Sequence, residues 1–108
     1  MSHEIMRVCI YDSLLTEEQR QKVLGKHTMK ESVVIDDHYF TNMMVMGKKF
    51  PTIKERSDAK TPARMLEITR DQLRKLDNHL NTYYRSNVML TTGSTVQTYF
   101  FKPIEDDE

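Results

Sequence analysis

The sequence predicts a single α+β domain, in which strands that are distant along the chain form a sheet packed against two helices. Two observations carry this prediction. Segments of strand-like composition alternate along the chain with two short segments that carry helix-start signals. The chain also has 108 residues, which is enough for one hydrophobic core and too few for two. We expect the domain to cover residues 1–103, followed by a solvated acidic tail at residues 104–108.

The predicted strands are short runs rich in β-branched, aromatic and other apolar residues, and turn residues bound them. They lie at residues 5–11, 33–35, 39–46, 64–69, 84–90 and 95–101. The first run ends at polar residues, as a buried strand would, and it is expected to be a central strand. The last two runs flank Thr92-Gly93-Ser94 and predict an antiparallel hairpin. Gly47-Lys48-Lys49 predicts another turn.

Each predicted helix begins with a capping box, in which a threonine hydroxyl and a glutamine side chain satisfy free amides at the helix start. The first box, Thr16 to Gln19, opens a helix over residues 17–24 that Gly25 can end. The second box, Thr69 to Gln72, opens a helix in which three leucines recur at helical spacing. These are Leu73, Leu76 and Leu80. The spacing therefore places Leu80 on the buried face of the helix.

Composition argues against several classes of function. The 16 basic and 16 acidic residues balance, so no strong field favours nucleic acid or an anionic membrane. No apolar run reaches the length that spans a bilayer, and the N-terminus lacks the pattern of a signal peptide. The single Cys9 is expected to be a buried, inert thiol, which fits a reducing and cytoplasmic location. The four histidines show no metal-ligand spacing, so neither a metal nor a cofactor is predicted.

Three clustered methionines, Met43, Met44 and Met46, allow two interpretations. Methionine fills irregular gaps in hydrophobic cores, and it also forms adaptable binding surfaces. A strand with apolar residues on both faces favours core positions for all three. An exposed binding surface is the alternative.

Two short stretches at opposite ends of the chain resemble signatures of the γ-glutamylcyclotransferase-like family, also called AIG2-like. The stretch Tyr11-Asp12-Ser13-Leu14-Leu15 is similar to a Tyr-Gly-Ser/Thr-Leu loop, whose backbone amides hold the substrate carboxylate in that family. The stretch Leu76-Asp77-Asn78-His79-Leu80 is similar to a Leu-Asp-x-x-Glu segment, whose Glu is the acid/base. Weaker likenesses follow the same order along the chain, at Gly47-x-x-Phe50-Pro51, Met65-Leu66-Glu67-Ile68 and Tyr84-Arg85.

The resemblance implies a small, mixed, partly closed β-barrel with two or more packed helices and a ligand pocket at its mouth. It also implies that the loop at residues 11–15 lies close in space to Leu80. The residues expected to border the pocket are Tyr11, Asp12, Ser13, Leu14, Leu15, Leu80 and Tyr84.

Two replacements remove chemistry that the family signatures carry. Asp12 stands in place of the loop glycine, and its charge would repel an anionic ligand unless the side chain turns away. Leu80 stands in place of the glutamate, and leucine cannot move the proton that cyclisation of a γ-glutamyl amide requires. Asp77 and His79 are possible substitutes, but helical geometry points both side chains away from the direction of Leu80.

The sequence therefore favours a catalytically inactive scaffold, a pseudoenzyme, that binds a protein partner or a small amino-acid-like metabolite. The alternative is an active γ-glutamyl amine or amide cyclotransferase, in which Asp77 or His79 has taken over as the acid/base. Neither nucleic acid nor a membrane is expected as a partner.

Overall fold

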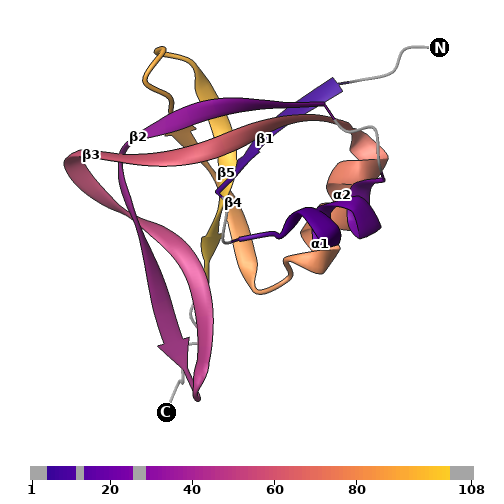
Figure 1. Cartoon of the computed structure of the whole chain (residues 1–108), viewed down its shortest axis with the longest axis horizontal. Helices are drawn as coiled ribbons and strands as arrows, with labels where there is room; N and C mark the ends of the chain where they lie inside the picture. The colour runs from indigo at the N-terminus through magenta and orange to yellow at the C-terminus, as the bar shows by residue number, and fades with distance from the viewer. Residues whose placement is uncertain (1–4, 12–13, 26–28, 103–108) are drawn as a thin grey trace.

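The computed structural model describes residues 5–11, 14–25 and 29–102, and their strands form one five-stranded sheet of order β2-β3-β1-β5-β4. The sheet curls into a half-barrel, and the two helices lie together on one side of it (Figure 1). The predicted α+β class and the partly closed barrel are therefore confirmed. The expected acidic tail lies outside the described residues. The elements are β1 (Ile5–Ile10), α1 (Glu17–Leu24), β2 (Met29–Val45), β3 (Lys48–Thr69), α2 (Arg70–His79), β4 (Tyr83–Met89) and β5 (Thr95–Phe101).

Strand β1 is the centre of the sheet, as its apolar sequence predicted. It runs antiparallel to β3, from the pair Ile5↔Thr69 onwards, and parallel to β5 at Val8↔Gln97. Cys9 is fully buried in this strand, and desolvation raises the pKa of its thiol to about 12. The thiolate that a nucleophile needs is therefore scarce near neutral pH, which agrees with the expected inert thiol.

Strands β2 and β3 form one long hairpin, which the sequence patterns had divided into shorter strands. A two-residue turn joins them at Met46 and Gly47, whose φ angles are 52° and 81°. The turn therefore begins one residue earlier than predicted, and Lys48 and Lys49 belong to β3. The prediction of separate strands was wrong because residues 54–60 are mostly exposed and polar. This part of β3 has no apolar pattern of its own, and it pairs with β2 at Lys54, Glu55 and Lys60.

The hairpin bends where its pairing changes register. Between the pairs Asp36↔Lys60 and His38↔Glu55, one residue of β2 faces four residues of β3. Figure 1 shows the part beyond this bend extending away from the helices. The part beyond the bend is called the distal hairpin and comprises residues 38–45 and 48–55.

Two aspartates stabilise the bend. Asp37 and Asp58 have φ angles of 59° and 69°, a conformation that aspartate tolerates better than most residues. The Asp37 carboxylate accepts a hydrogen bond of 3.0 Å from the Asp58 amide. Beside them, Lys60 forms an ion pair of 2.7 Å with Asp36, which joins the two strands across the bend.

The half-barrel closes at one point only among the described residues. Ile35 of β2 forms an isolated bridge with Leu90, and the Thr91 amide donates a hydrogen bond of 3.0 Å to the Val34 carbonyl. Ile35 is fully buried at this contact. The remaining outer edges of β2 and β4 form no further ladder within the described chain.

Both predicted capping boxes are present, and the helix starts are confirmed. Thr16 Oγ1 accepts a hydrogen bond from the Gln19 amide, and Thr69 Oγ1 accepts one from the Gln72 amide, each at 3.1 Å. The Gln72 side-chain amide also donates to the Leu24 carbonyl at 2.7 Å. The second capping box therefore also ties the end of α1 to the start of α2.

Two of the three clustered methionines lie at the surface. Met44 is 60% exposed and Met46 at the turn is 97% exposed, whereas Met43 is half-buried. The expectation that all three belong to the core was wrong, because the distal hairpin extends past the main body of the molecule. Only inward residues such as Ile53, which is 2% exposed, join the core from this part of the chain.

Candidate functional site

The end of β1 lies beside a cluster of tyrosines and polar side chains. The Tyr11 hydroxyl donates a hydrogen bond of 2.7 Å to the Tyr99 carbonyl, and Thr52 Oγ1 accepts one of 3.1 Å from the Phe101 amide. Tyr99 and Phe101 alternate with the residues of β5 whose backbone pairs with β4, so their own backbone groups point towards the β1 side. Since β1 ends at Ile10, side chains here replace the strand pairing that a longer β1 would supply.

The structure brings part of the predicted pocket lining into one buried cluster. Tyr11, Leu14, Leu15 and Leu80 are each at most 6% exposed and belong to the same hydrophobic core. The Leu14 amide donates to the Tyr11 carbonyl at 2.9 Å, so the chain turns directly after β1. Asp12 and Ser13 lie outside the described residues. The expected carboxylate-binding loop therefore stays a prediction.

Leu80 lies just beyond α2, which ends at His79. Its amide still donates to the Leu76 carbonyl at 2.9 Å, but its φ of −104° and ψ of 49° are not helical. The Leu80 carbonyl in turn accepts a hydrogen bond of 3.0 Å from the Tyr83 amide at the start of β4. The prediction that Leu80 continues the helix was wrong, because the chain already turns towards β4 at this residue. Its side chain is nevertheless buried.

Asp77, one of the two possible substitutes for the missing glutamate, has a carboxylate that is already engaged. Arg85 donates to it from Nε at 3.0 Å and from Nη2 at 3.1 Å, and the Tyr99 hydroxyl donates at 2.7 Å. Arg85 also donates from Nη1 to the Gln97 side-chain oxygen at 2.5 Å. We refer to Asp77, Arg85, Gln97 and Tyr99 as the Asp77 network. Such a two-point guanidinium contact favours the charged carboxylate and fixes its direction.

His79, the second possible substitute, is an exposed residue in the last turn of α2. A positive charge at this position interacts favourably with the helix dipole.

The Asp77 network lines a cavity of about 310 Å³, to which Tyr83 also contributes. The Asp77 and Arg85 side chains are 38% and 29% exposed, so this ion pair faces the cavity opening. A volume near the lower limit of small-molecule sites suits a ligand of amino-acid size. The cavity lining carries groups of both charges, the Asp77 carboxylate and the Arg85 guanidinium, which are paired with each other.

Burial raises the pKa of the three tyrosines in this region. Desolvation raises the pKa of Tyr83 to about 12. Desolvation also raises the pKa of Tyr11, although a hydrogen bond with Thr52 partly opposes it. For Tyr99, the hydrogen bond to the Asp77 carboxylate adds to the effect of burial. All three phenols therefore stay protonated near neutral pH and act as hydrogen-bond donors.

A larger groove of about 520 Å³ lies between the distal hairpin and strands β4 and β5. Tyr84, which was predicted to border the family pocket, lines this groove instead of the cavity at the Asp77 network. It is 48% exposed and stacks on Phe100 with 5.5 Å between ring centroids. The His38 and Phe100 rings, which both line the groove, have their centroids 5.7 Å apart.

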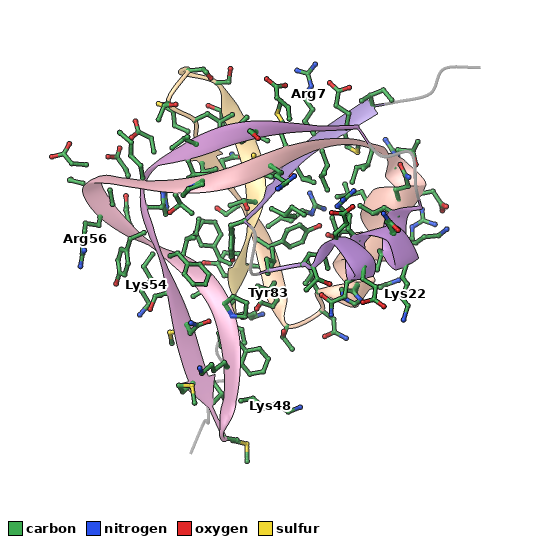
Figure 2. All side chains as sticks on the ribbon, in the orientation of Figure 1. Arg7, Lys22, Lys48, Lys54, Arg56 and Tyr83 are labelled. Atoms are coloured by element: carbon green, nitrogen blue, oxygen red, sulfur yellow. The ribbon has the colours of Figure 1, made fainter. Side chains whose placement is uncertain are left out.

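Sequence reasoning missed three features of this region. Arg85 was part of a strand-start likeness, but nothing in that pattern named Asp77 as its partner. Gln97 carries no signal at all, because it reaches the network only through the pairing of β5 with β4. The groove was missed because its lining comes from four strands. In Figure 2, Tyr83 lies between the helices and the distal hairpin, where these strands meet.

Comparison with protein-family models found no match, and comparison with curated protein sequences found none either. Solved structures do match. The solution structure of At3g28950.1 from Arabidopsis thaliana is 18% identical, with a TM-score of 0.70 over 94% of this chain and 66% of its own. A gamma-glutamyl cyclotransferase is 14% identical, with a TM-score of 0.70 over 94% of this chain and 69% of its own.

The chain has the γ-glutamylcyclotransferase-like fold. The human protein loc79017 gives the same result, with 15% identity and a TM-score of 0.73 over 94% of this chain and 69% of its own. The chain thus spans about two thirds of the length of these structures. The resemblance drawn from the two short signatures is confirmed at the level of the fold.

Two classes of feature were also sought in the described part of the chain. Its histidine, cysteine, aspartate and glutamate side chains form no group of three that could hold a metal ion. Neither of its helices is long and apolar enough to cross a membrane.

Proposed function

We propose that this chain is a non-catalytic protein of γ-glutamylcyclotransferase-like fold, which acts by binding a protein partner or a small amino-acid-like metabolite. The observation that carries the proposal is the buried leucine at position 80, with 6% of its surface exposed. Forming 5-oxoproline from a γ-glutamyl amide needs one group that removes a proton from the attacking amine and returns it to the leaving amine. A leucine side chain cannot do either.

The two candidate substitutes do not remedy this loss. The Asp77 carboxylate accepts three hydrogen bonds from Arg85 and Tyr99, so taking up a proton would break a two-point ion pair. His79 is exposed on α2, whereas the Leu80 side chain points into the core. The Asp77 carboxylate is therefore held by its ion pair, and the His79 side chain lies at the surface rather than beside the buried side chain of Leu80.

Ligand binding is supported by the cavity at the Asp77 network. The Tyr83 and Tyr99 hydroxyls that line it already donate to the Pro51 carbonyl and the Asp77 carboxylate, so they offer a small polar ligand acceptor oxygens. A carboxylate that lines a cavity is also the feature that favours the alternative function, an active cyclotransferase acting through Asp77. An assay of turnover separates the two.

The test is release of 5-oxoproline from γ-glutamyl amino acids and γ-glutamyl amines. We expect no turnover by the unmodified protein. The double variant Asp12→Gly with Leu80→Glu should gain activity, because it restores both residues that the family signatures carry. Asp12→Gly with Leu80→Gln is the matched control. Glutamine is polar and has nearly the same shape as glutamate, but its side chain has no titratable proton.

Clear turnover by the unmodified protein would contradict the proposal. If Asp77→Asn then abolished that turnover while His79→Ala preserved it, Asp77 would be the shifted acid/base. Partner binding is tested separately by pull-down from the native host, which should recover a protein in stoichiometric amount. A salt-sensitive shift of DNA or RNA should be absent near physiological ionic strength.

A further inference from the structure

The side chain of a buried arginine in α1 forms no hydrogen bond within the described residues. The Arg20 side chain is 7% exposed, and in this part of the chain its one ion contact is to Glu17, with 3.8 Å between Arg20 Nη2 and Glu17 Oε2. That distance is too long for a hydrogen bond. The Glu17 side chain is 67% exposed, so water competes for its carboxylate. The N–H donors of the Arg20 guanidinium therefore have no acceptor among the residues that the structure describes.

A charged side chain in such a position needs a physical reason. A guanidinium keeps its charge when it is buried, and a buried charge without a partner destabilises the folded state. Arginine often packs its aliphatic stem on apolar surface while its charged end stays in water, but here the side chain as a whole is covered. A buried polar group without a protein partner commonly contacts a water molecule or an ion. An anion would supply both the missing acceptors and the missing negative charge.

Arg20 borders a cavity of about 200 Å³ at the start of α1. The other lining residues are Ile10, Leu15, Thr16, Glu17 and Arg64. Thr16 is the N-cap, and Glu17 begins the first turn, where helix amides have no carbonyl partner within the helix and carry a partial positive charge. Arg64 already has another interaction, so only Arg20 is counted as a side-chain donor. The cavity therefore combines a buried guanidinium with the positive end of a helix.

We propose that this cavity binds a tetrahedral oxyanion such as phosphate, with the Arg20 guanidinium as its main donor. The volume is smaller than that of sites for whole drug-sized ligands, so it suits a small ion or the phosphate group of a larger molecule. A guanidinium pairs with phosphate through two parallel hydrogen bonds, which use donors that the described chain leaves without an acceptor. The guanidinium can occupy both oxygens of a carboxylate, whereas phosphate keeps further oxygens for the amides at the helix start.

The Glu17 carboxylate competes with such an anion, because it lies near the same guanidinium. The contact is long and largely exposed, so an anion that hydrogen-bonds to Arg20 directly should displace it. The inference does not depend on the proposed function, since this cavity shares no lining residue with the cavity at the Asp77 network. Its test also needs no assay of 5-oxoproline release, so either idea can fail without the other.

The test is calorimetric titration of the full chain with inorganic phosphate, in a chloride buffer of fixed ionic strength. We expect one phosphate to bind, and Arg20→Met should weaken the binding about tenfold or more, because the charged hydrogen bonds are lost. Lys22→Met is the matched control, since it removes the same charge from an exposed position of the same helix (Figure 2). It should leave the affinity unchanged. Glu17→Gln removes the competing carboxylate and should tighten the binding about twofold to fivefold.

Urea unfolding separates binding from a structural role of Arg20. Phosphate should raise the urea midpoint of the unmodified protein and of Lys22→Met, but not that of Arg20→Met, which should be at least as stable as the unmodified protein without phosphate. Absence of phosphate binding, or equal binding by Arg20→Met, would overturn the proposal. So would tighter binding of acetate than of phosphate. Phosphate binding that appears only in Asp12→Asn would also contradict it, because the Asp12 carboxylate would then be the anion that Arg20 takes.

Discussion

The Asp77 network and the distal hairpin place polar and apolar groups in opposite ways. In the network, charged and phenolic side chains are partly or fully buried and bond to one another between α2 and β5. In the distal hairpin, the apolar side chains of Phe40 and Met44 are 39% and 60% exposed, and the outer backbone of β2 forms no further ladder within the described chain. The two regions are joined where the Tyr83 hydroxyl donates to the Pro51 carbonyl at 2.9 Å.

This difference shows that the residues of the second signature lie in the bonded, partly buried part of the molecule, whereas the distal hairpin exposes apolar side chains. Near the second signature, the Asp77 carboxylate is bonded to Arg85 and Tyr99, and the Leu80 side chain is buried in the core. The distal hairpin contributes Ile53 to the core but leaves Phe40 and Met44 partly exposed. Substitutions in the two regions should therefore affect different properties.

The largest expected effect is a loss of stability when a buried side chain of α2 is shortened. Leu76 is fully buried beneath the Asp77 network, and Leu76→Ala should lower the free energy of unfolding by about 2–5 kcal/mol. Met44→Ala in the distal hairpin should change it by no more than about 0.5 kcal/mol. Urea unfolding of the three proteins measures both values. Equal losses would show that the distal hairpin is part of the core.

Alkaline pH should destabilise the tyrosine cluster. The pKa of Tyr83 is about 12 in the folded chain, against about 10 in an unfolded one, so the folded state holds this proton more tightly. The resulting stability is complete below pH ~10 and is lost as pH rises towards the folded pKa. Tyr11 and Tyr99 act in the same direction, because their pKa values are also raised.

Urea midpoints measured from about pH 8 to pH 11 test this effect. Tyr83→Phe should make the alkaline loss of stability shallower. Tyr84→Phe is the matched control, because its side chain is 48% exposed, and it should leave the slope unchanged. If the two variants behaved alike, burial of Tyr83 would not explain the pH dependence.

The smallest expected effect is a gain in stability from a substitution at the turn between β2 and β3. Met46 and Gly47 both have positive φ angles, which is the pattern of a type I′ turn. Asn-Gly is strongly favoured in such turns, so Met46→Asn should stabilise the chain by about 0.5–1 kcal/mol. Met44→Asn, in the strand, should give no gain. An unchanged or lower urea midpoint for Met46→Asn would count against the turn geometry.

Local hydrogen bonding made several elements predictable. The threonine and glutamine of each capping box lie three residues apart, so Thr16 and Thr69 marked both helix starts correctly. The β4–β5 hairpin was equally accessible, since a short polar turn joins two neighbouring strands. In contrast, β3 was predicted only near its end at residues 64–69, because its middle is held by pairing with β2 and carries no apolar pattern of its own.

By itself, the sequence determined the α+β class, the central β1, the helix starts and the resemblance to the γ-glutamylcyclotransferase-like fold, which comparison with solved structures confirmed. These depend on residues that are close along the chain. Only the tertiary structure decided that Arg85 and Tyr99 occupy the Asp77 carboxylate, and that Met44 and Met46 lie in solvent. The reason is physical: a side chain's partners and its burial depend on segments that folding brings from far along the chain.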